Sequence, residues 1–284
     1  MKRYVFSFLI FLCVFSVQAQ QPGKHALVIG LGEQLDRSWA KINGDKDITY
    51  VVEMLGAMGY SDIVTLKNEQ ATKAAIVDAF ASLAARCRRG DAVHVHYSGH
   101  GQLMTDVNGD ESFKWSGRHA QWDEAWVPYD AYMVYGPNDK GEKHFSDDEV
   151  AACLGAIRKR IGNNGELVVV VDACHSGDAT CGDVPPVRGI GTKFCIPLGN
   201  DDVPVEKPMP EQWLTISACK PFQLNMEMNS PRVGKLTYAL YTMGSGVFDK
   251  GNEELQKALA TFMDNNKGPL PQTPMVTGVK KITE

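Results

Sequence analysis

A run of four valines at positions 168–171 leads directly into the polar sequence Asp-Ala-Cys-His-Ser-Gly, in which the thiol is that of Cys174. Consecutive β-branched residues are typical of a strand that is buried on both faces, as in a parallel sheet covered by helices. Ligands and catalytic groups gather at the carboxyl ends of the strands in such a sheet. The sequence therefore predicts a reactive thiol at that edge.

A second apolar stretch, residues 92–98, has the same design and ends in Gly-His-Gly around His100. If the two strands are neighbours, the His100 imidazole can accept the proton of the Cys174 thiol and activate it as a nucleophile. The amides of Gly101 and Cys174 are candidates for an oxyanion hole. The two segments together predict a cysteine hydrolase with a Cys-His dyad.

Strands and helices alternate through most of the chain, which predicts an α/β fold with a mostly parallel sheet covered on both faces. A polar excursion is expected at 102–122 and a long irregular loop at 178–212. The sequence Ser-Asp-Asp-Glu at 146–149 is a capping box that opens a helix. The expected strands are 25–29, 63–66, the stretch that begins at 92 and leads to His100, 168–171 and 213–217, and the expected helices are 47–58, 71–87, 147–161, 235–243 and 253–265.

The first nineteen residues predict a cleaved secretory signal. Lys2 and Arg3 precede an almost wholly apolar run, and Val-Gln-Ala at 17–19 suits signal peptidase. The apolar run is shorter than the roughly 20 residues of a membrane-spanning helix, so no stable membrane insertion is expected after cleavage. The mature protein is expected in the periplasm or outside the cell.

Charge and cysteine content narrow the function further. The formal net charge is −5, which argues against nucleic acid as the main partner. No Cys-x-x-Cys spacing is present, which disfavours a cysteine zinc site. The cysteines left after signal removal are either small buried hydrophobic residues or, for Cys181 and Cys195, partners in a disulfide that export would permit.

The motifs Tyr-Ser-Gly-His-Gly and Asp-Ala-Cys-His-Ser-Gly, in that order, resemble those of the caspase/metacaspase superfamily of cysteine peptidases, metacaspases above all. The resemblance implies a caspase-like three-layer sandwich over residues 20–284. Within it, 20–177 would be a large-subunit-like region, 178–212 a processing segment and 213–284 a small-subunit-like region. It also implies endopeptidase activity with His100 and Cys174 as the dyad. One position departs from the family pattern: Cys219 is followed by Lys220-Pro221, where the family often has an acidic residue.

Substrate preference follows from charge and from the resemblance. Asp172 lies two residues before the nucleophile, where its carboxylate would pair with a cationic side chain. Metacaspases line this pocket with acids, and Asp45 and Ser98 match two further pocket positions. We therefore expect protein or peptide substrates that are cut after Arg or Lys. The oligomeric state is not predicted.

No cofactor is expected to be required for the chemistry. The resemblance implies a Ca²⁺ site at Asp123, Asp147 and Asp148, and hard carboxylate ligands suit that ion. Without the resemblance, Asp147 and Asp148 are ordinary residues at the start of a helix.

Basic residues of the long loop, namely Arg188, Lys193 and Lys207, are candidate self-processing sites. Two other functions remain open at this stage. One is a metallohydrolase built on His94, His96 and His100. The other is a non-catalytic binding module that keeps the fold.

Overall fold

The computed structural model describes residues 21–109, 114–115, 118–119, 122–174, 187–197, 210–221 and 223–282. Its centre is a six-stranded sheet in the order β13-β10-β9-β3-β1-β2. All neighbouring pairs are parallel except β10 with β13. The strands are β1 (Lys24–Gly30), β2 (Asp62–Lys67), β3 (Ala92–Ser98), β9 (Glu166–Asp172), β10 (Leu214–Ser217) and β13 (Met275–Gly278).

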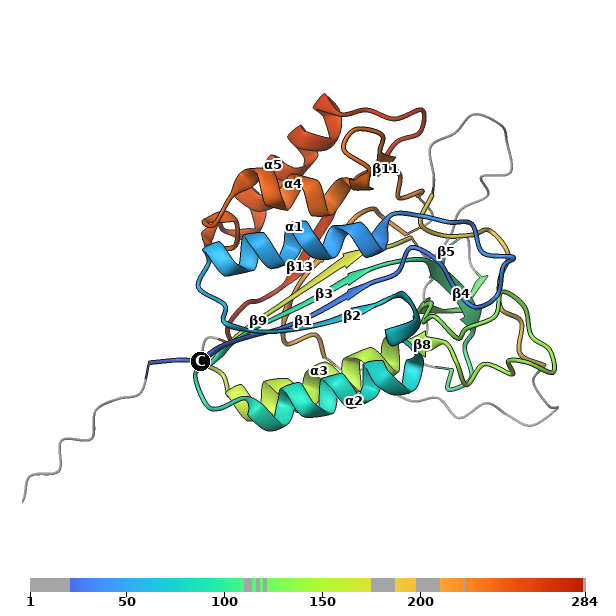
Figure 1. The fold of residues 1–284 in the computed structure, drawn as a ribbon, viewed down its shortest axis with the longest axis horizontal. Coiled ribbons are helices and arrows are strands. Elements are labelled where there is room, and N and C mark those ends of the chain that lie inside the picture. The colour runs from blue at the N-terminus through green and yellow to red at the C-terminus, as the bar shows by residue number, and fades with distance from the viewer. Residues whose placement is uncertain are drawn as a thin grey trace, which may run out of the picture.

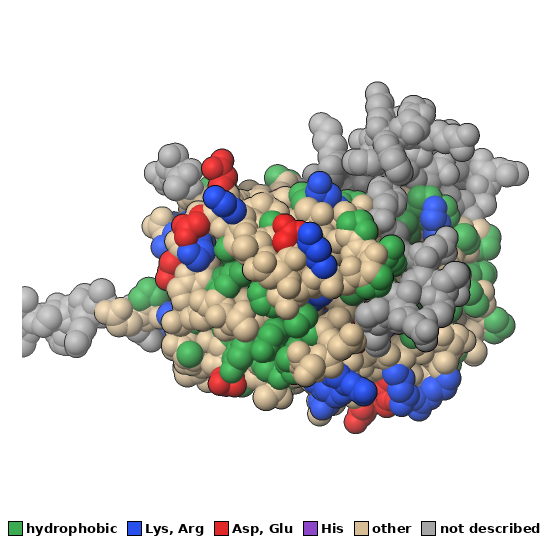
Figure 2. Space-filling view, turned by 90° about the horizontal axis from the view of Figure 1, so that it is seen from above, with side chains coloured by type: hydrophobic (Ala, Val, Ile, Leu, Met, Phe, Trp, Pro, Cys, Tyr) green, Lys and Arg blue, Asp and Glu red, His purple; other side chains and the backbone are tan. Residues whose placement is uncertain are grey.

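Helices cover both faces of this sheet, as the sequence predicts (Figure 1). Helices α1, α4 and α5 lie on one face, and helices α2 and α3 lie on the other. Figure 2 looks onto the first layer, where hydrophobic side chains lie between basic and acidic ones. The bounds are α1 (Gly44–Ala57), α2 (Lys73–Arg86), α3 (Asp147–Ile161), α4 (Lys235–Met243) and α5 (Asn252–Asn265).

The buried strands supply alternate residues to two hydrophobic cores. In β9, Val168 and Val170 pack with α1, α4 and α5, whereas Val169 and Val171 pack with α2 and α3. Side chains alternate between the faces of a strand, so an unbroken valine run is what a sheet with two covered faces requires. This explains why the segment before the thiol is wholly apolar.

A smaller sheet, in the order β4-β7-β8, stands at the carboxyl end of the main strands (Figure 1). It consists of β4 (Gly101–Thr105), β7 (Trp122–Trp126) and β8 (Phe145–Ser146). The interpretation of 102–122 as a polar excursion is therefore wrong at its start, because β4 is buried throughout. The minor elements are β5 (Lys114–Trp115), β6 (Arg118–His119), β11 (Glu227–Met228), β12 (Val233–Gly234), η1 (Asn68–Gln70) and η2 (Val247–Asp249).

The predicted helix starts and strand positions agree with the structure to within a few residues. The capping box is present, since Ser146 accepts from the Glu149 amide and Glu149 accepts from the Ser146 amide. Residues 1–20, which hold the predicted signal, lie outside the described residues. Among the residues that the structure describes, no helix combines the length and the apolar character needed to cross a bilayer.

Candidate active site

His100 and Cys174 follow neighbouring parallel strands at the same level. Strand β3 pairs with β9 so that Ser98 lies opposite Asp172, and each candidate residue comes two positions later. The Gly99 amide continues this pairing by donating to the Asp172 carbonyl oxygen at 3.4 Å. The predicted adjacency of the two strands is thus confirmed, and both side chains emerge at one edge of the sheet.

A peptide carbonyl of the chain itself lies between the two amides that the sequence suggests as an oxyanion hole. The carbonyl oxygen of Arg188 accepts from the Cys174 amide at 2.8 Å and from the Gly101 amide at 3.4 Å. The Arg188 amide donates to the Asn225 carbonyl oxygen at 3.0 Å. Arg188 is therefore held by its backbone on both sides, in the position that a substrate residue before a scissile bond would occupy.

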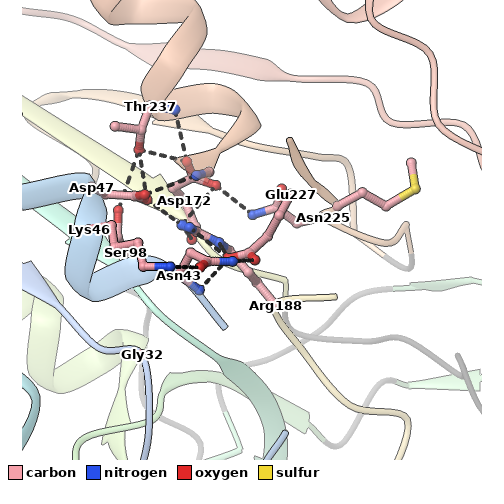
Figure 3. Close-up of polar contacts among 12 residues, drawn as sticks. Gly32, Asn43, Lys46, Asp47, Ser98, Asp172, Arg188, Asn225, Glu227 and Thr237 are labelled. Atoms are coloured by element: carbon pink, nitrogen blue, oxygen red, sulfur yellow. Dashed lines mark hydrogen bonds and ion pairs between the residues drawn. The ribbon is translucent and has the colours of Figure 1, made fainter. Parts of the chain in front are cut away.

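The Arg188 side chain is fully buried in a pocket of three carboxylates (Figure 3). One terminal nitrogen lies 2.7 Å from Asp47 and 3.5 Å from Asp172. The other terminal nitrogen lies 3.0 Å from Glu227, and Nε donates to the same Glu227 oxygen at 3.0 Å. A planar guanidinium with donors along two edges matches this arrangement. We call Asp47, Asp172 and Glu227 the acidic pocket.

Helix α4 supports two of these carboxylates. Thr237, in the first turn, donates to Asp172 through its amide at 2.8 Å and through its hydroxyl at 2.7 Å. The Gly234 amide, at the N-cap, donates to Asp47 at 2.9 Å. Unsatisfied amides at a helix N-terminus stabilise anions, so α4 helps to hold two acids in a buried site.

The pKa values of Asp47 and Asp172 are shifted in opposite directions. Burial and the neighbouring Asp172 raise the pKa of Asp47 to about 6, although Arg188 opposes them. Burial also acts to raise the pKa of Asp172, but the charge of Arg188 and the hydrogen bonds from Asn225 and Thr237 outweigh it and lower that pKa. Burial disfavours the Arg188 cation, yet the three carboxylates raise the pKa of its guanidinium. The pocket is thus built for a cation.

The orientation of the His100 ring is fixed by a backbone carbonyl. Nε2 lies 2.7 Å from the Ala40 carbonyl oxygen, and Nδ1 has no hydrogen-bond partner among the described residues. A carbonyl oxygen only accepts, so Nε2 carries the proton and Nδ1 of the neutral ring is free to accept one. Burial lowers the pKa of His100 to about 4, although the Ala40 bond opposes it. The ring centroids of Trp39 and His100 are 5.0 Å apart.

The Cys174 thiol donates to the Gln223 carbonyl oxygen at 2.7 Å. A second buried thiol, Cys219, donates to the same oxygen at 3.4 Å. A hydrogen bond with Cys174, together with burial, raises the pKa of Cys219 well above its ordinary value. Cys219 is therefore a protonated neighbour of Cys174, and no disulfide is present among the described cysteines.

Asp45 does not belong to the acidic pocket, and the expectation for it is corrected. It forms an ion pair at 3.3 Å with Lys67, the last residue of β2. Asp47 takes the pocket position, because residues two apart on a helix point about 200° apart. Ser98 is buried beside the pocket, where its hydroxyl lies 3.4 Å from that of Thr237.

The three acids expected to bind a metal ion do come together. Asp123 lies on β7, and Asp147 and Asp148 open α3. One carboxylate oxygen from each lies within 4.8 Å of the others. Two oxygen ligands of one Ca²⁺, at 2.3–2.6 Å each, are separated by no more than about 5 Å, so the donor set fits that ion.

His94 and His96 are core residues of β3. Both are fully buried, and their rings stack at 5.9 Å beside Phe248. Burial lowers the pKa of both residues. Among the described residues, neither belongs to a group of three potential metal ligands. These positions do not support a metallohydrolase built on the histidines.

Several site residues are absent from the sequence-based predictions. Ala40 and Asn225 act through their backbone carbonyls, and Glu227 lies in the two-residue strand β11, so no periodicity marks any of them. Asn225 donates to Asp172 at 2.7 Å, and its carbonyl holds the Arg188 amide. The usable signal is the basic character of Arg188 in the long loop, which predicts a processing site.

Comparison with known proteins agrees with this architecture. The family model "Metacaspase, peptidase C14 domain" matches residues 24–184, more than half of the chain. A Metacaspase-1A of Neurospora crassa is 30% identical over 166 residues, which cover 54% of this chain and 32% of the relative. Metacaspase-2 of Arabidopsis thaliana is 29% identical over 170 residues, which cover 57% of this chain and 36% of the relative. The chain thus spans about a third of the length of these curated relatives.

Two solved structures share the fold. A protein from Geobacter sulfurreducens gives a TM-score of 0.62 at 22% identity, with 93% of this chain and 95% of that chain covered. Caspase-1 from Spodoptera frugiperda gives a TM-score of 0.54 at 12% identity, with 90% and 86% covered. Family match, fold and paired motifs together show that the chain belongs to the metacaspase family of cysteine-type peptidases.

Proposed function

We propose that the protein is an arginine-directed cysteine endopeptidase that cleaves its own chain between Arg188 and Gly189. The observation that carries the proposal is that the Arg188 side chain fills the acidic pocket while its carbonyl oxygen accepts from the Cys174 and Gly101 amides. A residue held in both ways resembles a bound substrate at the position before the scissile bond.

Each group of the site has one role in the proposed cleavage reaction. The Cys174 thiol leaves the Gln223 carbonyl, transfers its proton to Nδ1 of His100 and attacks the Arg188 carbonyl carbon. The amides of Cys174 and Gly101 stabilise the developing oxyanion. His100 then protonates the leaving amine of Gly189, and water hydrolyses the thioester to return free Cys174. Ala40 keeps the imidazole in the required tautomer.

Selectivity for Arg over Lys follows from the two-sided contacts of the guanidinium. Asp47 and Asp172 bind one terminal nitrogen, while Glu227 binds Nε and the other terminal nitrogen. A lysine ammonium is a single point of charge and cannot bond to both sides at once. A Lys substrate would leave a buried acid without its partner, which is costly.

Gly189 suits the position after the cut. A Cβ built on Gly189 would lie 2.2 Å from the Cys174 carbonyl oxygen. The residue after the bond is therefore required to be glycine in this conformation. Lys193, a second candidate processing site, lies away from the acidic pocket, with its ammonium 4.2 Å from the Trp122 ring centroid. Lys207, the third, lies outside the described residues.

Calcium is proposed as a ligand of Asp123, Asp147 and Asp148, which the spacing of their oxygens supports. The ion would neutralise the three carboxylates and tie β7 to the start of α3. Export is proposed from the charged and apolar pattern of residues 1–19.

A peptide panel tests the specificity directly. Fluorogenic peptides that end in Arg, Lys or Asp are compared at equal length, with Cys174→Ala as the inactive control. We expect Arg peptides to be cut best, Lys peptides at least about tenfold less well, and Asp peptides not at all. Equal rates for Arg and Lys would refute the two-sided pocket, and preferred cleavage after Asp would refute the acidic pocket as the specificity site.

A further inference from the structure

Residues 187–197 run alongside β4 and are joined to it by two isolated β-bridges, at Gly189 and at Phe194. The Phe194 amide donates to the Leu103 carbonyl oxygen at 2.8 Å, and the Thr105 amide donates to the Phe194 carbonyl oxygen at 3.0 Å. The Ile196 amide donates to the Thr105 hydroxyl at 2.8 Å. These bonds use the outer edge of β4, which is otherwise an edge strand of its small sheet. We call residues 189–196 the strap.

The strap bulges between its two attachment points. Gly189 pairs with Gly101 and Phe194 pairs with Met104, so five steps along the strap span only three along β4. Gln102 holds the bulge, because its amide nitrogen donates to the Thr192 carbonyl oxygen at 2.8 Å. The Gln102 oxygen lies 2.8 Å from Nε2 of His144, which fixes the orientation of the amide.

Phe194 is the deepest point of the strap. Its side chain is fully buried and packs with Met104 and Ala125, with Ile196 beside it. The ring centroids of Phe194 and His144 are 4.3 Å apart. An aromatic side chain of this size removes a large apolar area from water when it is buried, so this is the main apolar anchor of the strap.

The scissile bond thus lies between two anchored side chains. Arg188 fills the acidic pocket on one side, and Phe194, six residues later, is buried in an apolar cluster with Met104 and Ala125. We propose that Phe194 is a positioning residue: its anchored ring holds the Arg188–Gly189 bond against Cys174 for self-cleavage and keeps the strap seated on β4 after the cut. This inference rests on the proposed self-cleavage at Arg188.

The anchor predicts a division between self-cleavage and cleavage of added peptides. A peptide that ends in Arg and a fluorogenic amide has no residues beyond the cut and does not use the strap. Loss of the anchor lets the bond drift from its reactive position, and small misplacements of reacting groups cost on the order of tenfold to a hundredfold in rate. Only the rate of self-cleavage should fall for this reason, and the rate of peptide cleavage should not.

The test compares Phe194→Ala with Phe194→Leu and with Cys195→Ala, whose side chain is the exposed neighbour on the strap. Disappearance of the intact chain is followed by mass spectrometry, and kcat/KM for the short Arg peptide is measured after each variant has been incubated until its intact chain has disappeared. We expect self-cleavage to slow by tenfold or more in Phe194→Ala and less in Phe194→Leu. Cys195→Ala should behave as wild type, and peptide cleavage should be unchanged in all three.

A second readout does not depend on cleavage. In a Cys174→Ala background, hydrogen exchange of the Phe194, Ile196 and Thr105 amides reports whether the strap is docked, and Phe194→Ala should lose this protection. An unchanged rate of self-cleavage, or unchanged hydrogen-exchange protection of the strap, in Phe194→Ala would refute the proposed role of Phe194 as the anchor. An equal loss of peptide activity and self-cleavage would assign Phe194 a merely structural role. Absence of any cut at Arg188 in the wild type, with strap protection still dependent on Phe194, would instead refute the proposed self-cleavage.

Discussion

The carbonyl oxygen of Arg188 lies 2.8 Å from the amide nitrogen of Cys174. This single contact connects a residue of the long irregular segment to the residue that carries the candidate nucleophile. Because the Arg188 guanidinium is at the same time bound by Asp47 and Glu227, backbone and side chain are placed together.

Removing one acid of the pocket should weaken recognition of arginine. Glu227→Gln keeps the shape of the side chain but removes the charge that faces Nε of the guanidinium. We expect kcat/KM for Arg peptides to fall on the order of a hundredfold, about 2–3 kcal/mol, and the preference for Arg over Lys to narrow. Asp45→Asn is the matched control, since Asp45 pairs with Lys67 instead, and it should leave both quantities unchanged.

Self-cleavage should rise with pH in two steps. Asp47 must be ionised to bind the guanidinium, and His100 must be neutral to accept the thiol proton. Burial and Asp172 raise the pKa of Asp47 to about 6, and burial lowers the pKa of His100 to about 4. Both groups act in their deprotonated forms, so the rate should fall as pH drops through 6 and again near 4.

Rate constants for loss of the intact chain between pH 3.5 and 8 measure this profile. In Asp47→Asn the whole profile should be lower and the step near pH 6 should disappear, whereas the step near pH 4 should remain. A step near pH 6 that persists in Asp47→Asn would assign it to another group.

The residue after the cut should be restricted to glycine. Gly189→Ala brings a methyl group against the Cys174 carbonyl oxygen, at 2.2 Å in the present conformation. We expect self-cleavage to slow by at least about tenfold, while the short Arg peptide is cut normally once the chain has been opened. Gly136→Ala is the control, because an added Cβ there meets no atom within 4 Å. Equal rates for Gly189→Ala and wild type would show that the strap binds differently.

Calcium should bind through the acids of β7 and α3. Isothermal titration with Ca²⁺ should give one site in the wild type and none in Asp148→Asn, because loss of one carboxylate removes both charge and a ligand. The midpoint temperature of thermal unfolding should rise on addition of Ca²⁺ only in the wild type, because a ligand stabilises the folded state to which it binds. Asp78→Asn, an exposed acid on α2, is the control. Retained binding in Asp148→Asn would exclude this site.

Much of the fold could be predicted because its signals are local. The valine run and the paired Gly-flanked exits of β3 and β9 indicate two buried neighbouring strands, and the pairing of Ser98 with Asp172 agrees. The sequence does not predict β4, because Gln102 and the residues after it are interpreted as a polar excursion. Gln102 is fully buried only because three distant groups bond to its amide.

The acidic pocket was only partly predictable. Asp172 follows from its position beside the nucleophile, but the choice between Asp45 and Asp47 depends on where α1 begins and which way each side chain points. Glu227 lies in a two-residue strand reached through irregular backbone, so nothing in its neighbourhood marks it. Arg188 carries a charge that suggests a cut, but the sequence does not show that its guanidinium is buried.

The most direct test of the account is the mass of the fragments that the purified chain forms on incubation. The wild type should yield a new N-terminus at Gly189 with first-order kinetics that do not depend on protein concentration, and Arg188→Lys should yield it more slowly. Cys174→Ala, His100→Ala and Arg188→Ala should stay intact at this bond. A wild-type chain that cuts Arg peptides yet remains whole between Arg188 and Gly189, or that is cut there equally well without Cys174, would contradict the account.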